Sequence, residues 1–511
     1  MYMTLEGIFG VPLDVAATFI ILFTIYGAVL EHSKAGEFYV NFSLAAMGSK
    51  PAGAGRTVTL ASFLLGGPSG SGVATTITLG SVAYPLLAKA GYDKNSAGGL
   101  LSAGGIGAII SLPVLGAAAF LIAEFLKISY LDVIAMVAIP TLLYYWSIFT
   151  MVELDANKFG ARPITLAREG VWSLTRKYGY HFVSLVAIVV FVLWGYTAIL
   201  SVIYAIFLAI ALSFIRRDTA LTPARLWRAL QDGSTGVLSV ASTCATAGII
   251  VGVVTLTGLG LKFSIIILDL AGGNLFLTVV YTAIAVWILG LAMPVTASYI
   301  IAAVITAPAM TKLGIPPHAA HMFIFYYAVL SEVSPPTALS PFAAAAITGG
   351  DPYKTTMMAW KYTLPAFLVP FMFTLHPDGI GLLLKGSWAN IAWTTITAAV
   401  GLAALAAGLT GWLLMKTTWF ERGLLVAARS GLGLSKSARG RDRADPFCSC
   451  GCAAVSASAF GRRPTIGCKL RLLPLIGPGP AADNQAADET LQSLPFPVFK
   501  LHKFHTHTTS P

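Results

Sequence analysis

The stretch "GGPSGSGVATT", residues 66–76, interrupts an otherwise apolar part of the chain. The segments before it, "RTVTLASFLL", and after it, "ITLGSVAYPLLAKAG", are both suited to a membrane interior. In hydrocarbon, each unpaired peptide N–H or C=O costs several kcal/mol, so a break built from Gly, Pro and Ser survives only inside protein or beside a water-filled cavity. The stretch therefore predicts a re-entrant helical hairpin.

Composition sets the class of protein. The chain has 511 residues, 56% of them hydrophobic and 11% charged, with a mean hydropathy of +0.77. Soluble domains carry about 25% charged residues, so we predict an all-α polytopic membrane protein in contact with membrane lipid. The net charge of +11 is attributed to basic cytoplasmic loops and a basic tail, and we expect no nucleic-acid partner.

Apolar segments divide the chain into candidate spans. We predict them at residues 15–30, 100–125, 131–152, 182–214 (long enough for two spans), 241–256, 320–347, 364–384 and 391–415. Two further stretches, about 56–90 and 276–311, are apolar but broken near their middles. Between the spans, "TPARLWRALQDG" (residues 222–233) predicts a separate amphipathic helix, with Thr222 as its cap and Pro223 in its first turn.

The second broken stretch repeats the first. An offset of 223 residues superposes Gly67 on Gly290, Pro85 on Pro308, Lys89 on Lys312, Gly91 on Gly314, Ala97 on Ala320, Ser111 on Ser334, and Pro113 on Pro336. Because the hairpin breaks and the later Pro breaks all find counterparts, we infer an internal duplication of one unit: a span, a broken hairpin and a broken span.

The number of crossings predicts that the two units are inverted. If each hairpin leaves on the side it enters, five crossings separate the units. This topology gathers most basic residues, Arg176, Lys177 and Arg216 among them, on one side, as the positive-inside rule requires. The other side keeps only Lys127, Lys262, Lys312 and Lys385.

The domain organisation follows from the repeat. Residues 1–153 form the first repeat, with its hairpin at about 56–90 and its broken span at about 97–126. Residues 154–240 contain a cytoplasmic loop, scaffold spans and the amphipathic arm. Residues 241–384 form the second repeat (hairpin about 276–311, broken span about 320–348), residues 385–428 a terminal span, and residues 429–511 a non-membrane tail.

Four breaks, "GGPSGSG", "IISLPVLG", "GLAMPVTAS" and "LSEVSPPTALSP", occupy two pairs of equivalent positions. Interrupted segments in matching places of two inverted halves point to a transporter's binding site, although any one break alone is more typical of ordinary helix packing. Hydroxyls and freed carbonyls suit Na⁺, and half-helix N-termini suit a carboxylate. The candidate site residues are Ser69, Gly70, Ser71, Thr75, Ser111, Pro113, Pro294, Thr296, Ser298, Glu332, Ser334, Pro335, Pro336 and Thr337.

The motifs "SGSGVATT", "LPVLGAAAFLIAEFL", "GLAMPVTASYIIA" and especially "SPPTALSPFAAAAITGGDP" resemble the large permease subunit of tripartite ATP-independent periplasmic (TRAP) transporters, in its form fused to the small subunit. The resemblance covers roughly residues 6–426. It implies an elevator transporter in a bacterial or archaeal inner membrane that takes up organic acids with Na⁺. It also implies two partners, a periplasmic substrate-binding protein and a small permease subunit or its fused equivalent.

The chain departs from the family pattern in the first hairpin. The family motif commonly reads Ser-Gly-Ser-Ala-x-Ala-Asn, whereas Gly72 stands here for the first Ala and Thr75 for the Asn. A hydroxyl in place of an amide keeps an oxygen ligand and loses two donors. The family's paired prolines in the first broken span are Leu112 and Pro113 here.

The two ends of the chain differ from what the duplicated unit leads us to expect. The second unit follows scaffold spans and an amphipathic arm, whereas no such segments precede the first unit. We therefore expect that the chain is truncated at its N-terminus or that its start has been misassigned. The tail is rich in Gly, Ser, Arg and Pro, and we expect disorder without function on the cytoplasmic side. Cys448, Cys450 and Cys452 are spaced too tightly for a familiar zinc site.

Other function classes remain in view. An intramembrane enzyme is disfavoured, because "GPSGS" lacks the last Gly of a nucleophile elbow and the chain has no P-loop. A channel would not need matched broken spans, whereas an ion-coupled antiporter of similar design fits the pattern. For Glu332 three roles compete: no role at an aqueous mouth, neutralisation of bound Na⁺, and transport of a proton, which would make the cycle partly proton-coupled.

Overall fold

The computed structural model describes residues 7–48, 52–66, 71–160, 170–291 and 293–411. Within these ranges every regular element is a helix and no strand occurs, which confirms the all-helical prediction. Five helical segments are long and apolar enough to cross a membrane, or six if α9 (Val171–Tyr178) and α10 (Tyr180–Leu193), bent by 66°, form one span. The predicted tail, with its three clustered Cys residues, lies outside the described residues.

The helices follow one another in three groups. The first contains α1 (Val11–Val15), the π-helix η1 (Ala16–Ile20), α2 (Ile21–His32), α3 (Ala35–Met47), α4 (Gly53–Leu64), α5 (Gly72–Lys89), α6 (Lys94–Gly107), η2 (Ala108–Ile110), α7 (Ala118–Leu126) and α8 (Tyr130–Phe159). The second contains α9, α10, α11 (Ala198–Ser213) and α12 (Pro223–Leu256). The third contains α13 (Leu259–Leu270), α14 (Leu275–Leu289), α15 (Val295–Lys312), α16 (Pro317–Ser331), α17 (Leu339–Thr348), α18 (Pro352–Thr363), η3 (Leu364–Leu368), α19 (Val369–Thr374), η4 (Pro377–Leu383) and α20 (Trp388–Thr410).

The predicted breaks coincide with helix ends. The first hairpin stretch divides into α4 and α5, and the second into α14 and α15. The first broken span divides into α6 with η2 and then α7, and the second into α16 and α17. Three residue types end the helices at these places, each for its own reason. Gly has no side chain to pack, Pro has no backbone N–H, and the Ser hydroxyl competes for backbone hydrogen bonds.

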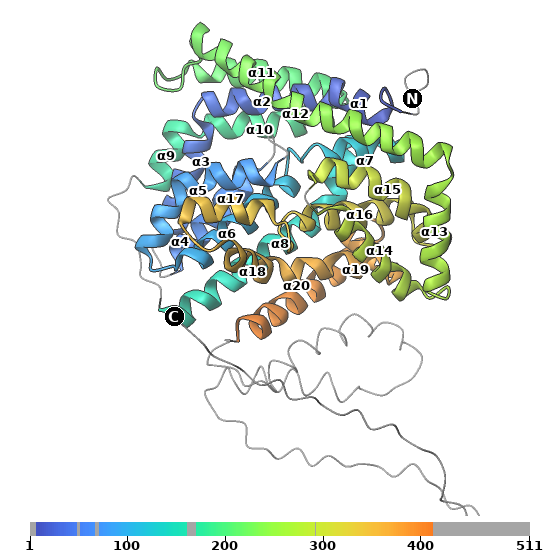
Figure 1. The fold of residues 1–511 in the computed structure, drawn as a ribbon. Helices are drawn as coiled ribbons and strands as arrows, with labels where there is room; N and C mark the ends of the chain where they lie inside the picture. Colours follow the sequence, from blue (N-terminus) through green and yellow to red (C-terminus); the bar gives the residue numbers. More distant parts are fainter. Residues whose placement is uncertain (1–6, 49–51, 67–70, 161–169, 292, 412–511) are drawn as a thin grey trace, which may run out of the picture. The chain divides into compact units, whose positions relative to one another are not determined.

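The helices that flank the breaks pack crosswise. Before each break, α6 packs on its own hairpin, α4 and α5, just as α16 packs on α14 and α15. After each break the partners change: α17 packs on α5 and α6, and α7 contacts α15 and α16 (Figure 1). Each hairpin is therefore held by helices from both parts of the chain.

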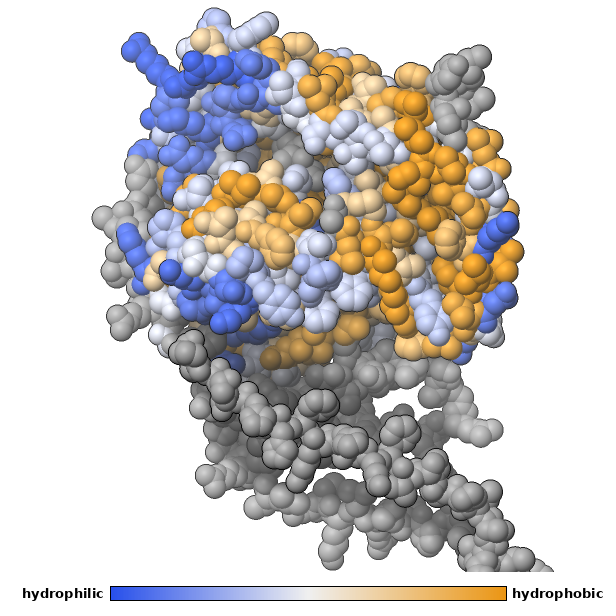
Figure 2. All heavy atoms as spheres, in the orientation of Figure 1, coloured by the Kyte–Doolittle hydropathy of each residue, from blue (hydrophilic) through white to orange (hydrophobic). Residues whose placement is uncertain are grey.

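Large apolar side chains cover much of the outer face of α13 and α14, at the right of Figure 2. Exposed members are Leu261, Ile265, Ile266, Leu270, Phe276 and Ile288. A contiguous apolar surface of this kind indicates contact with lipid or with another membrane subunit.

The amphipathic arm is not a separate element. Helix α12 runs without interruption from Pro223 to Leu256, so the arm and the predicted span 241–256 form one helix. Pro223 does occupy the first turn, but the side chain of Thr222 makes no capping hydrogen bond, contrary to prediction. A straight continuation is possible because no Gly-Pro or Pro break separates the two parts.

Two further predictions about elements were incorrect or incomplete. Residues 364–384 form η3, α19 and η4 instead of one span, because Pro365, Pro370 and Pro377 interrupt the backbone hydrogen bonds. Helices α3 and α13 were not predicted at all. They begin after residues with left-handed backbone, Lys34 and Gly258, which turn the chain immediately after a span.

Candidate functional site

The carboxylate of Glu332, directly after α16, reaches the first turn of α5. Its Oε1 accepts hydrogen bonds from the N–H of Val73 at 3.0 Å and from the hydroxyl of Ser340 at 2.9 Å. The residue is only 5% exposed, which disfavours the alternative in which it lies at an aqueous mouth. A helix N-terminus offers unpaired N–H groups and partial positive charge, which stabilise a carboxylate.

Gly72 makes room for this contact. A Cβ at position 72 would lie 2.9 Å from Oε2 and 3.0 Å from Oε1 of Glu332, and 2.9 Å from Cγ2 of Ile106. The Ala of the TRAP motif would therefore displace the carboxylate or the Ile106 side chain. This close approach gives a physical reason for the departure at Gly72.

Ser71 begins α5 as its cap. Its hydroxyl oxygen accepts the N–H of Ala74 at 3.3 Å, and its carbonyl accepts the hydroxyl of Thr75 at 3.1 Å. The predicted residues Ser71 and Thr75 thus lie at the helix end that Glu332 contacts. The other two predicted residues of this hairpin tip, Ser69 and Gly70, lie outside the described residues.

Ser111 marks the first broken span. Its hydroxyl donates to the carbonyl of Gly107 at 3.0 Å and shares a 2.8 Å hydrogen bond with the hydroxyl of Tyr145. A Cβ on Gly66 would lie 2.1 Å from Cβ of Ser111, so the end of α4 and the break are in contact. Pro113 follows a cis peptide bond.

Helix α8 supplies partners to the backbone of this first break. The carbonyl of Ile110 accepts the hydroxyl of Thr141 at 2.7 Å, and the N–H of Leu115 donates to the hydroxyl of Tyr130 at 3.2 Å. Irregular backbone inside a membrane protein requires such partners. Sequence reasoning missed these three α8 side chains, including Tyr145, because α8 reads as a plain apolar span.

The second hairpin tip contains Pro294, Thr296 and Ser298. Pro294 precedes α15, and the hydroxyl of Ser298 donates to its carbonyl at 3.2 Å. Thr296 and Ser298 are both buried. No side-chain cap hydrogen bond closes the start of α15, in contrast to α5.

The second broken span contains the other four predicted residues. Ser334 is buried, and its hydroxyl donates to the carbonyl of Leu330 at 2.8 Å. Pro335 and Pro336 are joined by a cis peptide bond. The hydroxyl oxygen of Thr337 is buried and has no hydrogen-bond partner in the described part of the chain.

Two orphaned hydroxyls are candidates for ligands. Buried polar groups are normally hydrogen-bonded, so the unpaired oxygens of Thr337 and of Thr76 call for a further partner. A small hard cation such as Na⁺ binds such hydroxyl and carbonyl oxygens. Thr76 and Ser340 were not predicted; their signals were the doubled Thr of "GVATT" and the last Ser of "PPTALSP".

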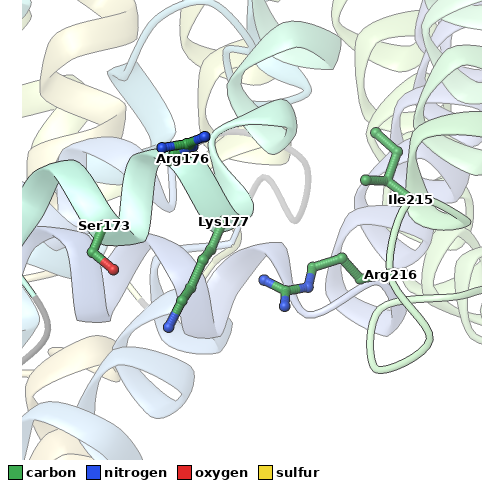
Figure 3. Close-up of a pocket in the computed structure, with 5 residues that line it drawn as sticks. All are labelled: Ser173, Arg176, Lys177, Ile215 and Arg216. Atoms are coloured by element: carbon green, nitrogen blue, oxygen red, sulfur yellow. The ribbon is translucent and has the colours of Figure 1, made fainter.

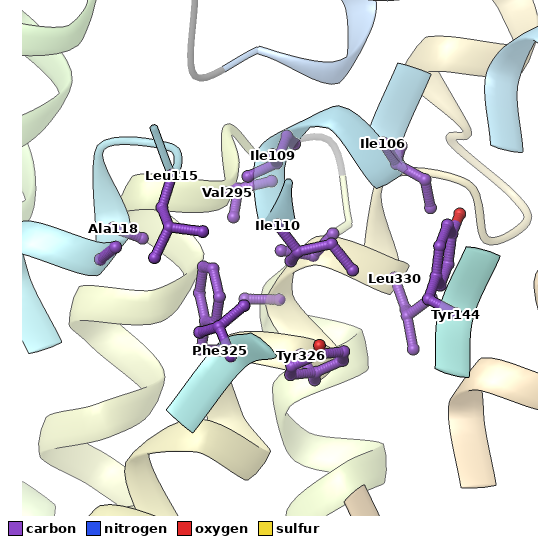
Figure 4. Packing of buried hydrophobic residues seen from close by; sticks show 14 of the residues in the cluster. Ile106, Ile109, Ile110, Leu115, Ala118, Tyr144, Val295, Phe325, Tyr326 and Leu330 are labelled. Atoms are coloured by element: carbon purple, nitrogen blue, oxygen red, sulfur yellow. The ribbon is translucent and has the colours of Figure 1, made fainter. Parts of the chain in front are cut away.

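An apolar cluster fills the space between the two broken spans. Figure 4 shows Ile109, Ile110 and Leu115 of the first break against Phe325 and Leu330 of α16. These side chains are almost completely buried. The two broken spans therefore meet through a buried apolar contact.

Comparisons with known proteins show the family of this chain. Residues 1–378 match the family model of the tripartite ATP-independent periplasmic transporter, DctM component. The large permease protein YiaN of the 2,3-diketo-L-gulonate TRAP transporter from Escherichia coli K12 is 25% identical over 381 residues, 72% of this chain and 86% of that protein. A chain described as a TRAP transporter large permease from Haemophilus influenzae is 30% identical over 91 residues, 18% of this chain and 23% of that protein.

The family model covers well over half of the 511 residues and assigns a transporter permease, which is not an enzyme class. Together with the apolar helices, it indicates a multi-pass protein of the bacterial inner membrane. The chain belongs to the TRAP transporter family, as the large permease component of binding-protein-dependent transport.

Proposed function

We propose that this chain is the permease of a Na⁺-coupled uptake system for organic acids, working by an elevator movement of two inverted repeats. The observation that supports it most is the crosswise packing: α17 lies on the first hairpin and α7 on the second. Broken helices whose ends converge on facing hairpins are the usual construction of ion and substrate sites in secondary transporters. The relative from Escherichia coli is named for 2,3-diketo-L-gulonate, itself the anion of an organic acid.

The coupling cation is proposed to bind at the two breaks. In the first half, Ser71 and carbonyls near Ser111 and Pro113 would hold it. In the second half, the proposed ligands are Thr337, whose orphaned hydroxyl needs a partner, with Ser298 and nearby carbonyls. These neutral oxygens suit a singly charged hard cation.

The substrate carboxylate is proposed to meet the start of α15. Helix α5 already has the carboxylate of Glu332 at its N-terminus, and a second anion there would be repelled. Helix α15 lacks a side-chain cap, so the N–H groups of Val295 and Thr296 are the better recipients of an anionic group.

Uptake by proteoliposomes tests the cation sites, with the chain, its binding protein and a small permease subunit reconstituted together. Ser71→Ala and Ser298→Ala should each raise the Na⁺ concentration for half-maximal uptake by about threefold or more, since each removes one proposed ligand. Thr197→Ala is the matched control, because Thr197 caps α11 through the N–H of Leu200 and is remote from the breaks. Unchanged Na⁺ dependence in both serine variants would contradict the proposal.

Proton coupling is the second candidate, favoured by the buried carboxylate of Glu332. A Glu332→Gln variant with a flattened pH dependence of uptake would indicate a proton carrier. A weaker Na⁺ response with the pH profile retained would indicate a cation ligand. Uptake that needs no binding protein would instead favour an ion-coupled antiporter.

A further inference from the structure

A basic pocket lies away from the breaks, between α9 and the connection from α11 to α12. It is an open cavity of about 500 Å³ lined by Ser173, Arg176, Lys177, Ile215 and Arg216. Figure 3 shows Arg176 and Lys177 on α9, with Arg216 extending from the other wall toward them. None of these side chains takes part in the proposed transport site.

Cationic side chains dominate the lining of the pocket. Three cationic side chains line it. Arg216 has its Nε 3.8 Å from the carboxylate of Asp218, and its guanidinium lies over the ring of Tyr178 at 4.9 Å. The Tyr178 hydroxyl also donates to Asp218 at 2.9 Å, which places that carboxylate beside the pocket.

Apolar helices lead to this pocket. Helix α10 begins and helix α11 ends at the pocket, and both expose large apolar side chains along their length, including Val186 and Phe207. At the pocket itself, Phe214 and Ile215 are each 59% exposed, and Trp172 is 80% exposed on α9. Exposed Trp beside cationic residues at the end of apolar helices is typical of a membrane–water interface.

The basic residues also lie on the side of the membrane that the positive-inside rule assigns to the cytoplasm. That leaflet is rich in anionic lipid, and basic pockets between membrane helices bind its head groups. Inorganic phosphate shares the head-group chemistry, but it would make no use of the adjoining apolar surface of Ile215 and Phe214.

We propose that this pocket binds the phosphate head group of an anionic phospholipid, whose acyl chains lie along α10 and α11. Arg176, Lys177 and Arg216 contact the phosphate, and Trp172 lies at the level of the head groups. The bound lipid fastens α9 to the α11–α12 connection, two elements on the cytoplasmic side of the scaffold spans.

Native mass spectrometry of the purified full-length chain in detergent tests the proposal, with phosphatidylglycerol and phosphatidylcholine added in equal amounts. Wild type should retain phosphatidylglycerol preferentially. The combined variant Arg176→Gln, Lys177→Gln and Arg216→Gln should lower that retention about tenfold or more, because each cation near anionic lipid adds to binding.

The matched control is Lys89→Gln, Arg228→Gln and Lys354→Gln, which removes three exposed cations outside the pocket. It should keep wild-type lipid retention. The milder pair Arg176→Lys and Arg216→Lys preserves charge and should retain the lipid even if the glutamine variant folds poorly. Equal losses in the pocket and control variants would overturn the proposal.

A last arm separates lipid from other anions. Wild type with bound phosphatidylglycerol is exposed to millimolar inorganic phosphate, and the lipid should stay bound. Complete displacement by phosphate would mean a free-anion site and would overturn the proposal. Retention of phosphatidylglycerol by the glutamine variant at the wild-type level would also overturn the proposal.

Discussion

The two halves place different residue pairs at equivalent positions. An offset of 223 relates Gly72 to Val295 and Ile109 to Glu332. In one pair, Glu332 lies against Gly72 and accepts the N–H of Val73. In the other, Ile109 and Val295 belong to one buried apolar cluster and are drawn near each other in Figure 4. One junction between broken span and hairpin is polar and the other apolar.

This difference gives two junctions at matching sequence positions unequal surroundings. The polar junction gives α5 an internal anion at its N-terminus, whereas α15 starts without any side-chain cap. The residue sizes in each pair fit one another. The long side chain of Glu332 faces Gly72, and the branched apolar side chains of Ile109 and Val295 face each other.

Placing a charge in the apolar junction should lower the stability of the protein more than any other change considered below. Ile109→Glu places a carboxylate in the apolar cluster, and an uncompensated buried charge costs about 3–5 kcal/mol. We expect a large fall in the thermal unfolding midpoint of the purified protein in detergent. Ile109→Val is the control, which should cost only about 1 kcal/mol.

A second variant sharpens this prediction. Ile109→Glu combined with Val295→Gly copies the polar pair into the apolar junction, where the N–H groups at the start of α15 could receive the carboxylate. Partial recovery of the midpoint would show that the glycine is what the carboxylate needs. If the single variant is as stable as Ile109→Val, the apolar character of this junction does not matter and the comparison fails.

The sequence could predict the positions of all four breaks because Gly, Pro and Ser inside apolar segments interrupt the regular hydrogen bonding of a membrane helix. It could not predict the contact of Glu332 with Val73. The two residues are 259 positions apart, and their approach depends on how α17 crosses the first hairpin. No local pattern encodes such a crossing. For the same reason the sequence could not predict that side chains of α8 form hydrogen bonds with the first break.

The errors in the fold have local causes. The boundary between the polar start and the apolar end of α12 was interpreted as a helix boundary, although a change of environment does not require a change of conformation. Residues 364–384 were interpreted by hydropathy, and their three prolines were given too little weight. The cation ligands at Ser69 and Gly70 stay predictions, since those residues lie outside the described ranges.

Removing the polar junction should have an intermediate effect. Glu332→Ile copies the residue of the first half, and it leaves the buried N–H of Val73 and hydroxyl of Ser340 without their acceptor. Each unsatisfied group costs about 1–3 kcal/mol, partly offset because no carboxylate is then buried. We expect a net loss of about 2 kcal/mol, measured as above.

Glu332→Gln is the matched control, because its amide oxygen can accept both hydrogen bonds. It should lie between wild type and Glu332→Ile. Equal stability of the isoleucine variant and wild type would mean that the polar contact serves transport alone.

Filling the space at Gly72 should have a smaller effect. Gly72→Ala restores the residue of the family motif, and its Cβ would meet the Glu332 carboxylate and Ile106. Overpacking of this kind costs about 1–2 kcal/mol, since a flexible side chain can shift. In a Glu332→Ala background the same change should cost distinctly less, which a double-mutant cycle measures. An identical cost in both backgrounds would assign the clash to Ile106 instead.

The smallest expected effect concerns another pair at the same offset, Asp93 and Pro316, which precede α6 and α16. Oδ1 of Asp93 accepts the N–H groups of Asn95 and Ser96, each at 3.0 Å. Pro316 makes no side-chain cap. Asp93→Ala should therefore destabilise by about 1 kcal/mol, and Pro316→Ala by clearly less.

The stabilising effect of Asp93 should depend on pH. Partial burial raises the pKa of Asp93, but hydrogen bonds from the side chain of Ser96 and from the N–H groups of Ser96 and Asn95 outweigh it and lower the pKa below its usual value. A group with a lowered folded-state pKa stabilises the fold above its unfolded pKa of about 3.9 and loses that contribution as the pH falls through the folded value. The difference in unfolding midpoint between wild type and Asp93→Ala should be complete at neutral pH and shrink below about pH 4. A difference that stays constant down to about pH 3 would show that the charge of the carboxylate contributes nothing to the stability that Asp93 provides.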